Sequence, residues 1–243
     1  MMKTAVLKKH RLAKWDVAVA TADDLLAVLD AWRREARPHL VCFCDANGLA
    51  HGWREPEVAA AYRAADAVMA DGIAVKALVR LTGGRLPTRV CGPAFFERAL
   101  AYGVPRGWRH YFCGGAPGVA QTLKSRMEAR CPGVRIVGVG CPPFADDPPV
   151  PAGVDADFVW VALGSPKQER WAARHLAEFG RATVLPVGAA FDFFVGRQRV
   201  APQWVQRLGG CWLWRLFSSR RTFRRNAWCL PRAAWILVKA ALS

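Results

Sequence analysis

Short apolar runs alternate with amphipathic segments along most of the chain. The runs at residues 67–70 and 158–162 are apolar throughout, which is typical of strands buried on both faces of a parallel sheet. The segment after Thr21 instead repeats its apolar residues at helical spacing, and Thr21 can cap that helix. The chain therefore shows the two periodicities that distinguish strands from helices.

Elements of these two kinds follow one another in order. Strands are predicted at residues 17–20, 39–44, 67–70, 109–113, 134–139, 158–162 and 182–187. Helices are predicted after residue 21, at residues 57–65, 73–81, 93–102 and 119–130, and from residue 166. This alternation indicates an α/β fold with a mostly parallel sheet and helices on both faces.

The stretch at residues 158–171 changes character in its middle. Its apolar strand ends in a turn, and Pro166 then fits the first turn of a helix. Lys167, Gln168 and Glu169 would lie beyond the carboxyl end of that strand, where a doubly wound sheet binds its ligands. The helix start and the Lys167 cation favour an anion such as a phosphate, although an ordinary solvated helix start has the same pattern.

Polar residues also follow other predicted strands. Asp45 and Asn47 lie in the loop predicted after one strand, Asp71 follows a second strand, and Asp192 follows a third. The carboxyl ends of these strands would meet at one edge of the sheet. A carboxylate at Asp71 can act as a general base on a hydroxyl, although an Asp-Gly pair before a helix more commonly caps it.

The turn at residues 114–118 resembles a phosphate-binding loop. Gly114 and Gly115 would let backbone N–H groups approach an anion. A nicotinamide-binding fold would also need an acidic residue at the end of the next strand, to hold the ribose. That strand ends in Gly138-Val139-Gly140-Cys141, so a dehydrogenase is disfavoured.

Metal chemistry has little support in the sequence. Asp155-Ala156-Asp157 spells the DxD motif of metal-dependent sugar transferases, but it precedes a strand and would lie at the wrong end of the sheet. The five histidines show no metal-ligand spacing. We therefore expect no metal site and no cofactor.

The charge and the cysteines bear on the partner and the compartment. The formal net charge of +16 points to an anionic partner, whether a nucleic acid, a membrane surface or a phosphorylated substrate. The eight cysteines are scattered and form no CxxC pair, as in proteins of a reducing compartment. No segment has 18 uncharged apolar residues, and the N-terminus has no apolar run of signal-peptide length. We expect a cytoplasmic protein.

The composition changes from residue 193 onward. This tail has no Asp or Glu, ten of its residues are Lys or Arg, and it holds five of the 11 tryptophans. Arginines and aromatic residues interleave in residues 212–225, which predicts an amphipathic helix suited to an anionic membrane surface. A nucleic-acid interface and a solvated basic face are the alternatives.

Five motifs occur in order along the chain. They are Asp66-Ala67-Val68-Met69-Ala70-Asp71-Gly72, Arg89-Val90-Cys91-Gly92, Gly114-Gly115-Ala116-Pro117-Gly118-Val119-Ala120, Gly164-Ser165-Pro166-Lys167-Gln168-Glu169 and Val187-Gly188-Ala189-Ala190-Phe191-Asp192-Phe193. Together they resemble the WecG/TagA/CpsF family of bacterial glycosyltransferases, from about Val41 to the C-terminus. Members of that family transfer a sugar from a UDP-sugar to a polyprenyl-diphosphate-linked sugar at the cytoplasmic face of the membrane. The resemblance also implies a Rossmann-like fold without a required metal.

The resemblance implies roles for individual residues. Asp71 would be the catalytic base that deprotonates the acceptor hydroxyl for an inverting displacement, and Asp45, which replaces a threonine of the family, adds a second candidate carboxylate. The implied substrate-binding residues are Asn47, Gly72, Arg89, Gly92, Gly114, Gly115, Gly164, Lys167, Gln168, Glu169 and Asp192. Arg215, Arg221 and Arg225 are similar in placement to arginines that meet the diphosphate of the lipid acceptor.

The sequence thus leads to one expectation and one alternative. We expect a glycosyltransferase core at residues 1–195 and a basic, membrane-associating helical appendage at residues 196–243. It would use a UDP-sugar and a polyprenyl-diphosphate-linked glycan in cell-surface polysaccharide or exopolysaccharide biosynthesis, as a peripheral protein on the inner face of the cytoplasmic membrane. No nucleic acid is expected as a partner. The alternative is a non-catalytic module that binds membrane or nucleic acid through its basic aromatic tail.

Overall fold

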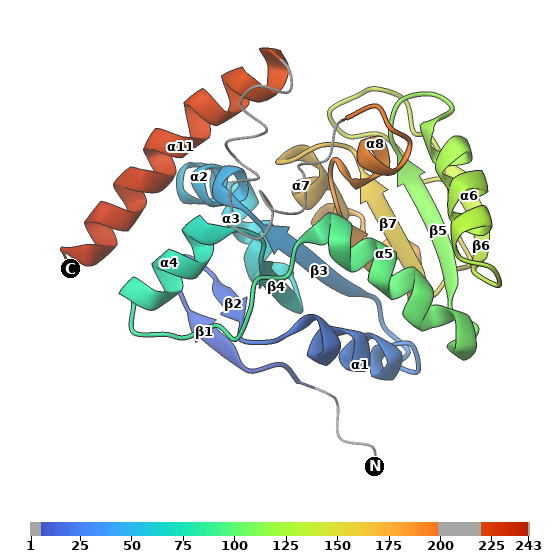
Figure 1. The fold of residues 1–243 in the computed structure, drawn as a ribbon, viewed down its shortest axis with the longest axis horizontal. Helices are drawn as coiled ribbons and strands as arrows, with labels where there is room; N and C mark the ends of the chain where they lie inside the picture. The colour runs from blue at the N-terminus through green and yellow to red at the C-terminus, as the bar shows by residue number, and fades with distance from the viewer. Residues whose placement is uncertain (1–5, 199–219, 243) are drawn as a thin grey trace.

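Six parallel strands form the centre of the molecule, in the order β4-β3-β8-β7-β5-β6 across the sheet (Figure 1). The computed structural model describes residues 6–198 and 220–242. The strands are β3 (His39–Cys44), β4 (Ala67–Ala70), β5 (Arg109–Gly114), β6 (Arg135–Gly140), β7 (Phe158–Ala162) and β8 (Thr183–Pro186). The parallel sheet expected from the sequence is confirmed.

Helices cover both faces of this sheet, so the fold is Rossmann-like. One face carries α1 (Ala22–Trp32), α5 (Gly92–Gly103), α6 (Val119–Arg130) and α8 (Ala190–Phe194). The other carries α2 (Ala46–Arg54), α3 (Pro56–Ala64), α4 (Ile73–Leu81), α7 (Lys167–Arg174) and α11 (Arg220–Ala241). Two short 3-10 helices, Val104–Arg106 and Leu176–Phe179, follow α5 and α7.

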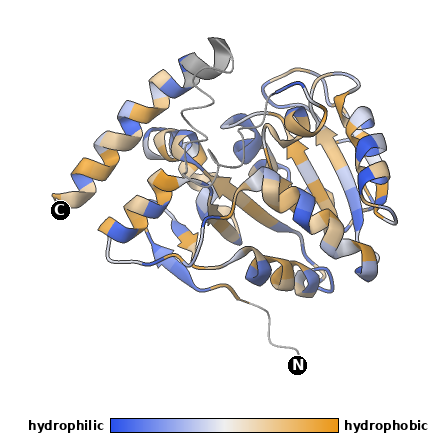
Figure 2. Cartoon of the chain, viewed as in Figure 1, coloured by the Kyte–Doolittle hydropathy of each residue, from blue (hydrophilic) through white to orange (hydrophobic). Residues whose placement is uncertain are grey.

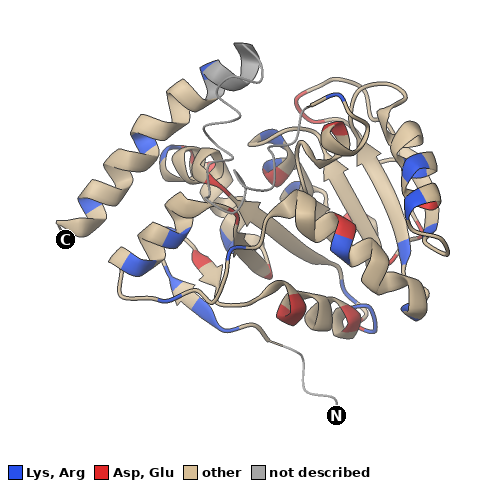
Figure 3. Cartoon of the chain, viewed as in Figure 1, with Lys and Arg blue, Asp and Glu red and all other residues tan. Residues whose placement is uncertain are grey.

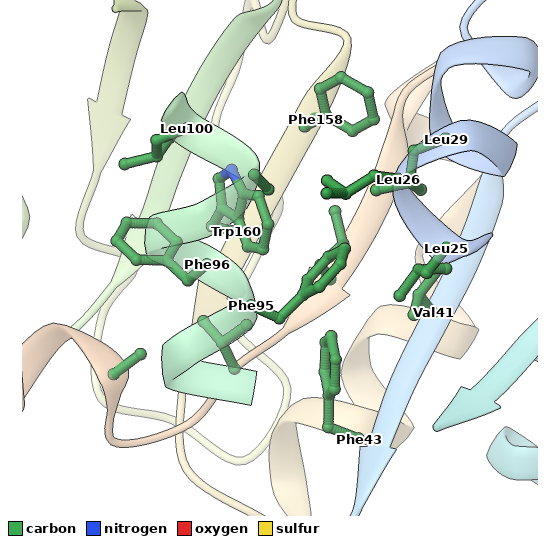
Figure 4. Packing of buried hydrophobic residues seen from close by; sticks show 14 of the residues in the cluster. Leu25, Leu26, Leu29, Val41, Phe43, Phe95, Phe96, Leu100, Phe158 and Trp160 are labelled. Carbon is green, nitrogen blue, oxygen red and sulfur yellow. The ribbon is translucent and has the colours of Figure 1, made fainter. Parts of the chain in front are cut away.

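The sheet has a hydrophobic core on each face. Successive side chains of a strand point to opposite faces, so they alternate between the two cores. In β3, Val41 and Phe43 face α1 and α5, whereas Leu40 and Cys42 belong to the core on the other face. Figure 4 shows the first core, in which the ring of Phe96 meets Trp160 edge to face at 4.9 Å between centroids. The two layers hold the carboxyl ends of the strands in fixed positions.

A small hairpin and the capped start of α1 lie near the N-terminus. The strands β1 (Lys9–Arg11) and β2 (Asp16–Ala18) form a small antiparallel hairpin, so the strand predicted at residues 17–20 pairs outside the parallel sheet. Thr21 caps α1 as predicted, because its side chain accepts from the Asp24 N–H and Asp24 accepts in return from Thr21.

The expectation of a loop after β3 was wrong. Residues 46–54 form the helix α2, and Asp45 is its N-cap. The run Asp45-Ala46-Asn47-Gly48 has the composition of a turn, yet a carboxylate followed three residues later by a close backbone N–H is also an N-cap. The sequence 190–194 likewise forms a short helix, α8, that was not predicted.

The last helix, α11, packs across α2 and α4 (Figure 1). Ala233 and Ile236 are buried in the core that also contains α2 and α4, and the ring of Trp228 stacks on His51 of α2 with 4.2 Å between centroids. Hydrophobic and hydrophilic residues are mixed along the helix (Figure 2). In the described part of the chain, no helix is long and apolar enough to cross a membrane.

Candidate active site

The pairing of β3 with β4 places two carboxylates side by side. Cys44 and Ala70 are register partners, so Asp45 and Asp71, which follow them, leave the same edge of the sheet on neighbouring strands. The backbone N–H of Asp71 donates to the Cys44 carbonyl at 2.9 Å. A Cβ built on Gly72 would lie 3.9 Å from the Asp45 Cα, which confirms how closely the two turns approach.

Asp71 does not cap the helix that it precedes. The N-cap of α4 is Gly72, whose φ of 137° is a conformation that residues with a side chain rarely adopt. This geometry lets the chain turn into α4 while the Asp71 carboxylate points elsewhere. Its Oδ2 accepts from the backbone N–H of Gly92, at the start of α5, at 3.0 Å. The capping role that local sequence favoured for Asp71 is therefore wrong.

Asp45 takes the capping role instead. Its Oδ1 accepts from the backbone N–H of Gly48 at 2.9 Å and so satisfies one free donor at the start of α2. The two carboxylates thus have different surroundings, because Asp45 belongs to a helix cap and Asp71 bridges from β4 to α5.

Three buried polar side chains lie beside this pair of carboxylates. Asn47, Gln168 and Glu169 are each 2–3% exposed. The Asn47 amide donates to the Ser165 hydroxyl at 3.4 Å, and the Gln168 amide donates to Oε1 of Glu169 at 3.1 Å. The contacts bring the start of α2 and the start of α7 together, as the sequence predicted for these three residues.

The charge state of Glu169 is set by its surroundings. Burial is the main cause that raises its pKa, to about 7, and the charge of Asp45 raises it further. Hydrogen bonds from its own backbone N–H, from Gln168 and from Ser165 oppose this rise. Glu169 is therefore protonated in a large fraction of molecules at neutral pH.

The glycines at the ends of β5 and β7 allow the backbones of these two segments to approach each other closely. Gly114 has a φ of 106°, and a Cβ there would lie 2.7 Å from the Ala162 carbonyl oxygen. The N–H of Gly115 donates to that same carbonyl at 2.8 Å, so it is not available to a phosphate. Gly164 also has a positive φ, of 84°, in the turn before α7. The turns after β5 and β7 thus meet at the carboxyl edge of the sheet, as expected. The close packing of their backbones explains why residues 114 and 115 are glycines.

Lys167 turns toward a different part of the molecule. Its ammonium group donates to the Ala145 carbonyl and lies 5.2 Å from the centroid of the Phe144 ring, both in the long loop after β6. With Arg170 and Arg174 it lines a small cavity of about 180 Å³. No described contact joins Lys167 to the two carboxylates.

The remaining predicted residues lie around the edge. Arg89 is exposed and directly precedes Val90, whose N–H donates to the Ala70 carbonyl at 3.0 Å, so this segment runs beside β4 next to Asp71. Asp192 lies in α8, with its Oδ1 3.9 Å from Nε of Arg197.

The acceptor arginines are only partly covered by the structure. Arg215 lies outside the described residues. Arg221 and Arg225 belong to α11, where only their backbone is described.

Two side chains near the site escaped the sequence analysis. Ser165 links Asn47 to α7, and its position in a Gly-Ser-Pro turn directly after a strand was the available signal. Tyr62 of α3 is buried next to Gly48, where a Cβ would lie 2.3 Å from the phenol oxygen. Only the packing of α3 on α2 reveals Tyr62.

Known proteins resemble this chain over most of its length. The model of the glycosyl transferase WecG/TagA/CpsF family matches residues 10–243. The chain belongs to the WecG/TagA/CpsF family. It is similar to two proteins named N-acetylglucosaminyldiphosphoundecaprenol N-acetyl-beta-D-mannosaminyltransferase, at 29% identity in Bacillus subtilis and 30% in Bacillus spizizenii. Each match spans 175 residues, which are 71% of this chain and 68% of the relative.

Membership of the WecG/TagA/CpsF family makes the protein a glycosyltransferase. The resemblance inferred from the five motifs is therefore confirmed, and the alternative of a non-catalytic binding module is wrong. Asp155, from the DxD sequence, pairs with Arg109 at the amino end of the sheet, far from the edge that carries Asp45 and Asp71. Among the described residues of this glycosyltransferase, no group of His, Cys, Asp and Glu could hold a metal ion.

Proposed function

We propose that the protein transfers a sugar from a UDP-sugar to a saccharide linked to a polyprenyl diphosphate, with inversion at the anomeric carbon, in the assembly of a cell-surface polysaccharide. The observation that carries this proposal is the pair of carboxylates at the ends of β3 and β4, next to buried polar groups that can bind a sugar. The names of the two Bacillus relatives add support, because they specify a diphosphoundecaprenol-linked acceptor.

In this proposal, Asp71 is the general base. The acceptor hydroxyl attacks the anomeric carbon, its proton passes to the Asp71 carboxylate, and UDP leaves with the electrons of the broken C–O bond. The hydrogen bond from Gly92 to Oδ2 fixes the orientation of the carboxylate. Asn47, Gln168 and Glu169 would bind the donor sugar, and Arg89 and Asp192 would contact the rest of the UDP-sugar.

No metal or cofactor is needed for this chemistry. The developing charge on the leaving diphosphate would be met by arginines, among them Arg89, which lies in the segment between α4 and α5 that runs beside the end of β4. Arg215, Arg221 and Arg225 would meet the diphosphate of the lipid acceptor. The division into a core at residues 1–195 and an appendage at residues 196–243 is part of this proposal.

We also propose that the enzyme works as a peripheral protein at the inner face of the cytoplasmic membrane. Lys76 and Arg80 of α4 and Arg85 in the following loop line a groove of about 630 Å³, and none of the three pairs with a described carboxylate. Figure 3 shows basic positions along α4. Exposed apolar side chains lie on α4 and on the neighbouring helix α11: Leu81 of α4 is 45% exposed and Trp235 of α11 is 57% exposed. Cations beside exposed apolar residues suit an anionic lipid surface.

The function is tested by measuring UDP release with a panel of UDP-sugars and lipid-linked acceptors extracted from bacterial membranes. We expect release with one donor, only when the acceptor is present, and a product of inverted anomeric configuration by NMR. Equal UDP release from every UDP-sugar, or a product of retained anomeric configuration, would contradict the proposal. NAD serves as the control ligand, and we expect no binding of it.

A further inference from the structure

Several buried polar atoms near the carboxylate pair have no hydrogen-bond partner among the described residues. They are Oδ1 of Asn47, Oε1 of Gln168 and the hydroxyl of Tyr62. Each side chain is at most 3% exposed. Because buried polar groups are nearly always hydrogen-bonded, such a group of atoms points to a ligand that supplies the missing partners.

Glu169 determines which way the Gln168 amide faces. Its Oε1 accepts from Nε2 of Gln168 at 3.1 Å, as a carboxylate oxygen or as the carbonyl oxygen of the neutral acid, so the amide nitrogen faces it. Oε1 of Gln168 is then left as an acceptor without a described partner, and the amide lies next to Gly188 after β8, where a Cβ would lie 3.4 Å from Nε2 and 3.8 Å from Oε1.

Neutral side chains and one carboxylate surround Glu169, and that carboxylate, Asp45, disfavours its charge. Cys42 and Cys44 come from β3, Tyr62 from α3 and Asp45 from the start of α2, and each is neutral or anionic. Ser165, in the turn before α7, donates a hydrogen bond to the carboxyl group. No described cation is among these groups. Burial raises the pKa of Glu169 to about 7, so both charge states occur near neutral pH.

We propose that Glu169 is a positioning residue for the UDP-sugar: it holds the Gln168 amide, and its neutral carboxyl group is the form that is compatible with donor binding. The inference rests on the proposed function. A UDP-sugar brings two negative charges to this edge of the sheet, which disfavours a carboxylate beside it. Donor binding therefore keeps Glu169 protonated, and donor affinity falls as the pH rises through the pKa of Glu169.

The test measures the Kd of UDP-N-acetylmannosamine by calorimetry with the full chain between pH 5.5 and 8.5, where its diphosphate does not titrate. For the native protein we expect a constant Kd at low pH and a rise toward about tenfold per pH unit above pH 7. Glu169→Gln keeps an acceptor for Gln168 and mimics the neutral acid, so its Kd should be low and independent of pH. Glu169→Leu should bind at least about tenfold more weakly at every pH, since it lacks that acceptor.

Two further variants show whether Glu169 acts through Gln168. In a Gln168→Ala background, Glu169→Leu should change the Kd no further, whereas additive losses would contradict the inference. A Glu169→Gln protein that keeps the pH profile of the native protein would also overturn it.

One measurement does not depend on the donor. NMR of protein labelled with ¹³C at the glutamate carboxyls should show one signal, absent in Glu169→Gln, that titrates near pH 7. A signal that titrates below pH 5 overturns the positioning role even if a UDP-sugar binds. If no UDP-sugar binds but this signal titrates near pH 7, the proposed donor is wrong while the buried neutral acid remains.

Discussion

At the scale of single residues, the roles of two neighbouring aspartates are reversed relative to the local sequence signals. An Asp-Gly pair before a helix favours a cap, yet Gly72 forms the N-cap of α4 and the carboxylate of Asp71 reaches α5. Asp45, in a run that has the composition of a loop, is the residue that caps a helix. The difference arises from long-range contacts, because Gly92 is 21 residues away from Asp71.

Glu169 should also reduce the stability of the fold. Its pKa is raised from 4.5 to about 7, so the folded protein binds more protons than the unfolded chain between these values. Its contribution is therefore fully present below pH 4.5 and is lost as the pH rises through 7. Glu169→Gln should raise the free energy of unfolding by roughly 2–3 kcal/mol at pH 8 and leave it nearly unchanged at pH 4.

Urea denaturation of the two proteins at both pH values checks this prediction. A gain of equal size at pH 4 and pH 8 would mean that the substitution acts through packing and not through the charge of Glu169. Together with the donor-binding profile, the expected result would show a residue kept for function at a cost in stability.

At the scale of elements, the sequence predicted most of what the sheet requires. Five of the six parallel strands are mostly apolar runs buried along most of their length, whereas the edge strand β6 is partly exposed, and such runs can be predicted because they depend only on local composition. The order of the strands and the register between β3 and β4 could not be read locally. Only this register explains why Asp45 and Asp71 lie side by side.

At the start of α7, too, the local sequence does not determine where each side chain points. The sequence placed Lys167, Gln168 and Glu169 together beyond the end of β7, and two of the three are buried in the site. Successive residues of a helix point about 100° apart, so they cannot all face one ligand. Lys167 bonds the Ala145 carbonyl because the irregular loop after β6 lies next to it, and no pattern in that loop predicts its path.

At the scale of the whole molecule, α4 and α11 lie side by side and give one part of the surface a mixed basic and apolar character. The Lys76, Arg80 and Arg85 side chains line the groove, and no described carboxylate pairs with them. In the membrane-bound enzyme that we propose, this surface would face the bilayer, and Asp71, at the start of α4, would lie close to the lipid-linked acceptor.

Reversing these three charges should therefore weaken membrane binding. We predict that Lys76→Glu/Arg80→Glu/Arg85→Glu binds vesicles with 30% phosphatidylglycerol at least about tenfold more weakly, because each basic residue near an anionic surface contributes about 1 kcal/mol. Co-sedimentation at several lipid concentrations measures the effect, and vesicles of phosphatidylcholine alone should bind neither protein.

The matched control is Lys124→Glu/Arg130→Glu/Arg135→Glu. These residues lie on α6 and β6, at the other end of the sheet, and the net charge changes by the same amount. This variant should bind nearly as well as the native protein. Equal losses in the two variants would show that binding follows net charge alone and not the surface formed by α4 and α11.

The most direct test of the account compares the kcat of Asp71→Asn with that of Asp45→Asn, once the donor and the acceptor are identified by UDP release. Asn can cap a helix as Asp does, so Asp45→Asn keeps the cap of α2 and should retain most of the activity. Asp71→Asn removes the proposed base and should lower kcat by about 10²-fold or more, with an unchanged melting temperature. Full activity in Asp71→Asn, with loss in Asp45→Asn, would contradict the account and make Asp45 the base.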